Sequence, residues 1–287
     1  MSKFINPRTD FAFKKIFGSP QSKDILINFL DALLYEGKSV IQDLTILDPY
    51  QVPRIRGIKE SYLDVKALLA DGQTVIIEMQ VLNVLGFKKR VLYNAAKSYS
   101  AQLEVGDDYA LLNPVIALTI TDFEMFSDSE RDVSRNSLNA VNDIKDYSND
   151  LELVFAELPK FRKEVSQLST LADKWLYFLK EAERLKSVPP NLDQEPAIHD
   201  AFEVARQSHL TKEELDILER QSFFIQDNKN SIRLGVMQGK AEGRKEGLEE
   251  GDKQARIEIA RSLKDKMSLS EIAAITGLTP EEIEEII

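Results

Sequence analysis

The clearest pattern of apolar and polar residues lies between residues 60 and 81. Two largely apolar runs rich in β-branched residues, ESYLDVKALLA and QTVIIEMQV, are separated by Asp71 and Gly72, which are typical turn residues. This pattern predicts a β-hairpin. Glu78 falls in the middle of the second run, where a carboxylate needs a cation or water nearby, because burying an unpaired charge is costly.

Helical and strand patterns surround this hairpin. Apolar residues recur every three or four positions in 9–18, 22–37 and 88–103, and Thr9 and Gly18 can begin and end the first of these predicted helices. Strand patterns occupy SVIQDLTILD, PVIALTITDF and DLELVFAEL, and PYQVPRIRG has the composition of a loop. The N-terminal half is therefore predicted to be α/β or α+β, with a mixed sheet flanked by helices.

The chain beyond about Pro159 has a helical pattern, with a proline-containing break near Val188. Its apolar residues fall on one helical face, so these helices are expected to cover the sheet. We divide the chain into a core (1–165), a helical cover (166–230), a glycine-repeat charged segment (231–252) and a small C-terminal unit (253–287).

Glycine recurs every fourth residue in the segment GVMQGKAEGRKEGLEEG. Each glycine costs a helix about 1 kcal/mol relative to alanine, so a flexible charged tether is predicted here. The alternative is a helix whose small residues allow another backbone to approach closely.

The last residues, DKMSLSEIAAITGLTPEEIEEI, resemble a helix-turn-helix. Ser270 is expected to cap its first helix, Gly277 to form the turn, and Thr279 and Pro280 to open the second helix. The second helix carries four glutamates and no basic residue, which would repel DNA. We therefore predict that this unit binds protein, including a second copy of the chain in a homo-oligomer.

Composition narrows the choice of chemistry. The 287 residues include no cysteine and two histidines, and 43% are hydrophobic, which is enough to bury a full core. Disulfides and thiolate catalysis are excluded, and zinc or histidine catalysis is disfavoured. The formal net charge of -11 argues against general attraction to nucleic acid. Without an apolar leader or a membrane-spanning run, we expect a soluble cytoplasmic protein that does not bind membranes.

The length of the hairpin loop decides whether two acids can meet. With a two-residue loop, Asp64 would lie opposite Met79 and point to the other face of the sheet from Glu78. With a three-residue loop that ends in a left-handed Gly72, Asp64 lies directly opposite Glu78. Cross-strand Cβ atoms are only about 5 Å apart, so two opposed carboxylates require a cation between them. The alternative, in which one carboxylate simply faces solvent, remains open.

A hard divalent metal would satisfy this pair. Magnesium is typically held by one or two carboxylates together with water and phosphate oxygens, which suits Asp64, Glu78 and the backbone carbonyl of Met79. Mn²⁺ or Ca²⁺ are alternative cations.

The acid, the hairpin and the sequence Glu78-Met79-Gln80 resemble the PD-(D/E)XK nuclease signature. The segments TDFAFKKIFG, FKKRVLYNAAKSY, YALLNPVIALTI and AELPKF resemble its recombination-promoting nuclease (Rpn) and transposase branch over roughly residues 1–230. The resemblance implies a restriction-endonuclease-like mixed sheet core, with Asp64 and Glu78 as metal ligands. Two features depart from the signature: Tyr62-Leu63 replaces a proline, and Gln80 stands where lysine is common.

Because glutamine offers a hydrogen bond but no charge, a cation must come from elsewhere. Lys66 shares a strand face with Asp64, and the stretch from Met79 to Leu103 contains no acid. That stretch is the predicted phosphate-facing surface, although an ordinary solvated helix face is the alternative. Its basic residues are Lys88, Lys89, Arg90 and Lys97. Asp10 resembles the N-terminal acid of the family, with helix capping as the alternative role.

Two functions remain open. The first is a magnesium-dependent DNA endonuclease of the Rpn type, linked to recombination or transposition, in which Gln80 orients the attacking water. The second is a weak or inactive nuclease fold that binds DNA or protein, which the glutamine and the acidic C-terminal unit favour.

Overall fold

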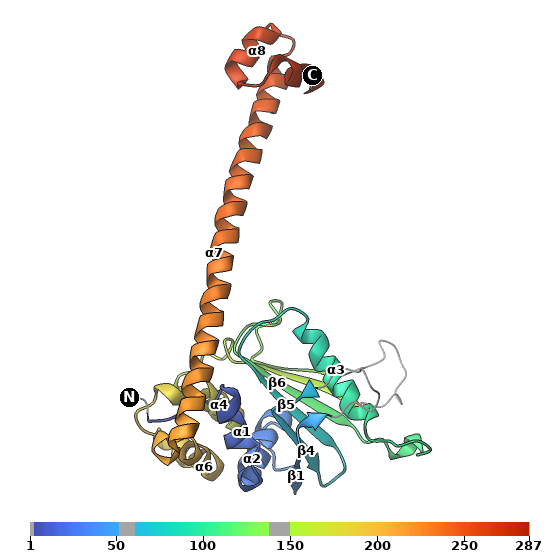
Figure 1. Cartoon of the computed structure of the whole chain (residues 1–287), viewed down its shortest axis with the longest axis vertical. Coiled ribbons are helices and arrows are strands. Elements are labelled where there is room, and N and C mark those ends of the chain that lie inside the picture. The colour runs from blue at the N-terminus through green and yellow to red at the C-terminus, as the bar shows by residue number, and fades with distance from the viewer. Residues whose placement is uncertain (1–2, 52–60, 138–149, 287) are drawn as a thin grey trace. The chain divides into compact units, whose positions relative to one another are not determined.

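The computed structural model describes residues 3–51, 61–137 and 150–286. It divides into two units, Met1–Ile225 and Gln226–Ile287, and each unit is considered separately (Figure 1). Most of the predicted loop PYQVPRIRG and the predicted hairpin start at Glu60 lie outside the described residues. Within the described ranges, no helix combines the length and apolar character that crossing a lipid bilayer requires.

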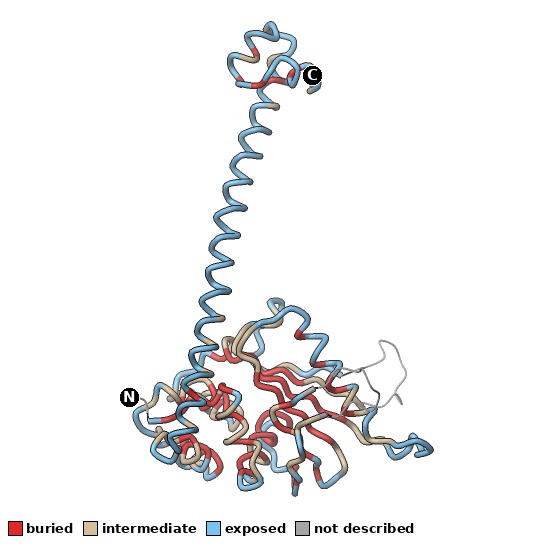
Figure 2. Tube along the Cα trace, in the orientation of Figure 1, coloured by how far each residue is buried: buried red, intermediate tan, exposed pale blue. Residues whose placement is uncertain are grey.

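The first unit is built on a mixed six-stranded sheet, as predicted. The order of its strands is β1 (Leu44–Leu47), β4 (Val65–Leu69), β5 (Thr74–Gln80), β6 (Val115–Thr121), β8 (Leu151–Glu157) and β7 (Val133–Ser137). Strands β5, β6 and β8 are parallel to one another, and the other neighbours are antiparallel. Every residue of β6 is buried, so the parallel strands form the centre of the unit (Figure 2).

The hairpin of β4 and β5 has the three-residue loop that sets the acids opposite each other. Val65 pairs with Ile77, and the amide of Leu69 donates to the carbonyl of Gln73 at 2.8 Å. Gly72 has a φ of +92°, a left-handed conformation that glycine adopts readily. Continued by one residue, this register places Asp64 opposite Glu78. A further pair of short strands, β2 (Tyr50–Gln51) and β3 (Ser61–Tyr62), precedes β4.

Helices cover both faces of the sheet (Figure 1). One face packs on α1 (Asp10–Phe17), α2 (Lys23–Leu34), α4 (Leu171–Glu181) and α6 (Pro196–Val204), with α5 (Pro190–Asp193) between the last two in sequence. The other face packs on α3 (Phe87–Ser100), whose buried Val91 and Ala95 join a cluster with Ile76 of β5. Thr9 caps α1 and Gly18 ends it, as predicted. The sheet is therefore enclosed, and polar side chains of β5 must find partners within the fold.

The glycine repeat is helical, so the prediction of a flexible tether is wrong. It lies within α7 (Lys212–Leu263), which begins in the first unit and continues in the second. The residues between the glycines are mostly good helix formers, and four-residue ion pairs such as Lys245 with Glu249 at 3.8 Å offset part of the glycine cost. The alternative was that the glycines allow another backbone to pack closely. In the described part of the chain no atom lies within 4 Å of a Cβ added at any of the five glycines, so no such packing is seen there.

The second unit ends in a small helical cluster. The end of α7 packs with α8 (Leu269–Thr276) and α9 (Pro280–Ile286) around Ala260, Ile272 and Ile283. Gly277 forms the turn with a φ of +70°, and Pro280 opens α9, as predicted. The predicted cap at Ser270 is wrong. Ser268 caps α8 instead, because it can exchange hydrogen bonds with Glu271 in a capping box.

Candidate active site

A cavity of about 860 Å³ opens at the C-terminal end of β5, between the sheet and α3. It brings together four of the predicted site residues of the hairpin, the N-terminal acid and two of the predicted basic residues. Its lining residues are Asp10, Tyr62, Asp64, Glu78, Met79, Gln80, Val84, Leu85, Gly86, Phe87, Lys89, Arg90, Tyr93 and Asn94. Carboxylates, cations and amides therefore converge where the antiparallel hairpin meets the parallel strands.

Asp64 lies in the short break between β3 and β4. Its Oδ2 accepts a hydrogen bond from the backbone amide of Met79 at 2.6 Å, and its Oδ1 is 3.9 Å from the ammonium group of Lys14. Lys14 also bonds Asp10 at 2.6 Å, one helical turn earlier in α1. The pKa of Asp64 is raised from 3.8 to about 7, mainly by burial; the neighbouring Asp10 carboxylate also raises it, whereas the Met79 amide and Lys14 lower it.

Glu78 is 8% exposed and points to the face of the sheet covered by α3. The amide nitrogen of Asn94 donates a short hydrogen bond to its Oε1, and Arg90 lies 3.5 Å from its Oε2. Arg90 and Asn94 are four residues apart on α3 and so share a helix face. Glu78 can therefore be buried in an apolar strand because this helix face supplies it with an amide and a guanidinium group as partners.

Gln80 is tied into the same network. Its amide nitrogen donates to the carbonyl of Leu82 at 2.6 Å, and its Oε1 accepts from Arg90 at 2.6 Å. Arg90 therefore bridges Glu78 and Gln80. It brings a positive charge to Gln80, which stands where the wider signature carries lysine. Sequence reasoning did not choose among the neighbouring cations.

The remaining predicted cations are placed differently. Lys89 lines the cavity beside Arg90, whereas Lys88 lies over the ring of Phe126 at 4.4 Å. Lys97 lies in the last turn of α3, and neither it nor Lys66 is among the described residues that line the cavity. Burial lowers the pKa of Lys66, and the Asp48 carboxylate partly offsets this effect. Of the basic residues predicted from the sequence, Lys89 and Arg90 are therefore the two among the described residues that line the cavity.

The donors present fit a divalent cation held by two carboxylates. Within the described ranges, no group of three or more histidine, cysteine, aspartate or glutamate side chains could hold a metal. Asp64 and Glu78 each have one oxygen fixed by an N–H donor, and the other oxygen faces a cation at 3.9 or 3.5 Å. Two carboxylates that line one cavity are a donor set that magnesium commonly takes in proteins, with water and phosphate completing the shell. The contribution of the Met79 carbonyl remains a prediction.

Sequence reasoning missed Asn94 and Lys14. Asn94 is 3% exposed, and its Oδ1 has no hydrogen-bond partner in the described part of the chain. The available signal was an asparagine between apolar residues on the buried face of α3, since a buried amide usually binds a polar group. Lys14 gave no such signal, because its role depends on how α1 packs beside the hairpin.

Comparison with known proteins identifies a sequence family for the chain. Residues 7–235 match the sequence model of the family described as PD-(D/E)XK nuclease family transposase. The match includes the hairpin, α3 and the helices that cover the sheet. No curated protein and no solved structure gave a match.

Proposed function

Because the chain belongs to the PD-(D/E)XK nuclease family of transposases, we propose that it is a magnesium-dependent endonuclease that hydrolyses phosphodiester bonds in DNA. Asp64 and Glu78 hold the cation in this proposal, with Mn²⁺ as a substitute. Recombination or transposition is the proposed biological setting, which the family membership alone supports.

The observation that carries the proposal is the convergence of Asp64, Glu78 and Arg90 in one cavity. The two acids come from opposed register positions of a hairpin, and α3 lays a guanidinium group 3.5 Å from one of them. A structural ion pair would explain Glu78 alone. It would not explain why a second carboxylate, Asp64, lines the same cavity despite the burial that raises its pKa.

A divalent cation, when bound, would polarise the phosphate and acidify water near it. The chain's own residues do the rest. The amide of Met79 and the side chain of Asn94 each fix one oxygen of an acid, and the opposite oxygens, which lie near Lys14 and Arg90, would be the ones available to hold the cation. Lys89, also in the cavity wall, attracts the DNA backbone.

Gln80 and Arg90 share the work of the missing lysine in this proposal. Gln80 donates one amide hydrogen to the carbonyl of Leu82, and its second amide hydrogen orients the attacking water. Arg90, held by the oxygen of Gln80, supplies the charge that stabilises the phosphate oxygens in the transition state.

The alternative is a protein that keeps the fold and binds DNA or protein without cleavage. The observation that favours it is the bonding of Gln80, since its oxygen and one of its amide hydrogens already have partners in the chain. This closed network would then be a structural substitute for the catalytic lysine.

Conversion of supercoiled plasmid to nicked circles, with and without Mg²⁺, separates the two functions. The proposal predicts nicking that requires the cation and that Asp64→Ala or Glu78→Ala abolishes while circular dichroism shows a folded protein. The exposed Asp200 on α6 lies outside the cavity, so Asp200→Ala is the matched control. Plasmid binding without any nicking in Mg²⁺ or Mn²⁺ would instead support the alternative.

A further inference from the structure

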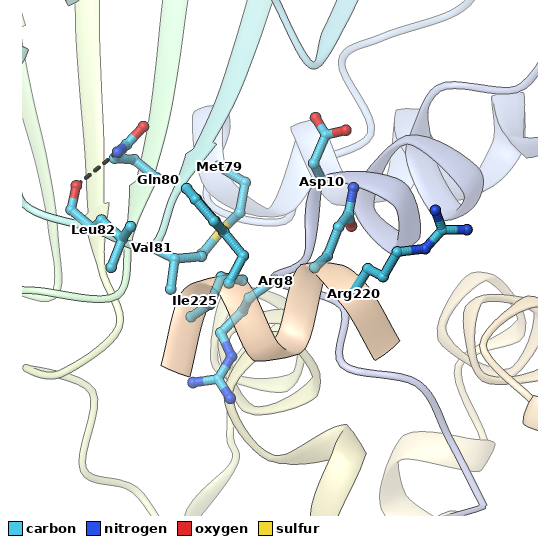
Figure 3. Close-up of a pocket in the computed structure, with 10 residues that line it drawn as sticks. Arg8, Asp10, Met79, Gln80, Val81, Leu82, Arg220 and Ile225 are labelled. Atoms are coloured by element: carbon cyan, nitrogen blue, oxygen red, sulfur yellow. Dashed lines mark hydrogen bonds between the residues drawn. The ribbon is translucent and has the colours of Figure 1, made fainter. Parts of the chain in front are cut away.

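A second cavity of about 420 Å³ lies directly beside the candidate active site. It shares Asp10, Met79 and Gln80 with the larger cavity, so the end of β5 forms the wall between them. The rest of its lining comes from Arg8, just before the cap of α1, from the chain after β5 and from residues 220–225 of α7 (Figure 3). Those additional residues are Arg8, Val81, Leu82, Arg220, Gln221, Phe224 and Ile225.

The walls of this second cavity are held in place by contacts at its borders. Gln221 of α7 accepts a hydrogen bond from the backbone amide of Phe11 at 3.1 Å, which fastens α7 to α1. Lys15 of α1 adds an ion pair with Glu214 of α7 at 2.5 Å. Arg8 is anchored by Asp122 at 2.9 Å. The elements that line the cavity are therefore held together by specific contacts within the first unit.

Its chemistry is apolar in the middle and cationic at the edge. Figure 3 shows Met79 and Val81 facing Ile225 of α7, with the guanidinium groups of Arg8 and Arg220 at two borders of the group. Phe224 adds an aromatic side chain that is 65% exposed. An apolar slot with an aromatic wall and an outward arginine suits a flat ring attached to an anionic chain.

We propose that this cavity binds one unstacked nucleobase of the strand that is cut, next to the scissile phosphate. The proposal rests on the proposed nuclease function. Phe224 stacks on the base, since aromatic stacking accepts any base. The exposed Arg220 contacts the adjoining phosphate. The shared wall at Met79 and Gln80 places this base beside the proposed catalytic carboxylates, so the base and the scissile phosphate occupy adjoining cavities.

The proposal has a consequence for substrate choice. A base that enters the cavity must leave the helical stack, and that step costs least where the strand is already unpaired or mismatched. We therefore infer that the protein cuts single-stranded or mismatched DNA in preference to a regular duplex.

Substitution of Phe224 tests the cavity, and the chain offers a matched control in its neighbour. Phe223 lies on the same turn of α7, is 62% exposed, and is not among the described residues lining the cavity. Because base stacking on an aromatic residue contributes about 1–3 kcal/mol, Phe224→Ala should lower kcat/KM on single-stranded DNA roughly tenfold or more. Phe223→Ala should change it less than about twofold.

A series of oligonucleotides, each with one abasic site, locates the base. One abasic position should slow the wild-type enzyme as much as Phe224→Ala does, and should add nothing further in that variant, because the two changes remove the same contact. Equal effects of Phe223→Ala and Phe224→Ala at every position would overturn the inference, while metal-dependent cleavage would leave the proposed function standing.

A binding measurement decides the question without relying on cleavage. Oligonucleotides with 2-aminopurine at successive positions report stacking by fluorescence when mixed with the full-length protein. A position-specific change that Phe224→Ala removes and Phe223→Ala retains supports the inference even if no cleavage occurs. A response that is the same at all positions, or that Phe224→Ala leaves intact, contradicts it.

Discussion

Replacing Asp64 with asparagine should stabilise the metal-free protein, and by more at high pH. Burial raises the pKa of Asp64 from 3.8 to about 7, so the folded state holds this proton more tightly than the unfolded state. At low pH Asp64 is protonated in both states and does not lower the free energy of unfolding. The free energy of unfolding then falls as the pH rises from 3.8 towards about 7. Asparagine never ionises and keeps an oxygen for the amide of Met79.

The size of the effect follows from the shift. At about 1.4 kcal/mol per pKa unit, the raised pKa of Asp64 lowers the stability of the fold by about 4 kcal/mol near pH 8 and by about 2 kcal/mol near pH 5, where the folded state keeps the proton that the unfolded state has lost. Any constant effect of asparagine cancels between the two conditions. The stability gained by Asp64→Asn should therefore be about 2–3 kcal/mol larger near pH 8 than near pH 5.

Urea unfolding in EDTA, followed by tryptophan fluorescence, measures this difference. Trp175 is the sole tryptophan, is fully buried, and packs against Phe17 and Phe29, so it reports on the core of the first unit. The exposed Asp200 provides the control Asp200→Asn, which should change stability little at either pH. If Asp64→Asn left the stability unchanged, or raised it equally at both pH values, the claim that burial raises the pKa of Asp64 would be wrong.

Four further predictions follow from single contacts. Asn94→Ala should raise the Mg²⁺ concentration for half-maximal nicking roughly tenfold, as measured by metal titration, because Glu78 loses a charge-assisted hydrogen bond. Gln80→Ala should lower the single-turnover rate more than DNA affinity, whereas Gln80→Lys should preserve or raise that rate unless the cation already present blocks the added ammonium group. Gly72→Ala should destabilise the protein by about 1–3 kcal/mol in urea, since a left-handed φ of +92° strains any Cβ. Gly243→Ala should increase the helical circular dichroism signal and stabilise α7 by up to about 1 kcal/mol, because nothing described lies within 4 Å of the added Cβ.

The hairpin register was predictable because it depends on local rules. Strand residues alternate between faces, and the choice between a two-residue and a three-residue loop was enough to decide whether Asp64 meets Glu78. Gly72 offered the conformation that the longer loop needs. The sequence thus predicted the strands and, for the three-residue loop that the structure shows, the opposed register of Asp64 and Glu78.

The partners of those acids depend on packing that no local rule supplies. Lys14 and Asp10 reach Asp64 because α1 lies beside the hairpin, although they precede it by 50 and 54 positions in sequence. Arg90 was one of several neighbouring cations until α3 was placed on the sheet. The pKa of Asp64 likewise follows from burial, which the sequence pattern did not specify.

The error over the glycine repeat has a different cause. Intrinsic glycine propensity was weighed alone, although the residues between the glycines favour a helix and the segment continues from a helix already formed on the first unit. Nucleation is the costly step, and a helix that is already begun extends more readily through poor residues.

The central claim is that Asp64 and Glu78 hold the cation that cleavage requires. Single-turnover cleavage of a labelled DNA strand over a range of Mg²⁺ concentrations, by the wild type, Asp64→Asn, Glu78→Gln and the control Asp200→Asn, tests it most directly. We expect cleavage by the wild type and Asp200→Asn only in the presence of Mg²⁺, and at least about a hundredfold loss in the two site variants. Equal cleavage rates for all four proteins would contradict the assignment of the site.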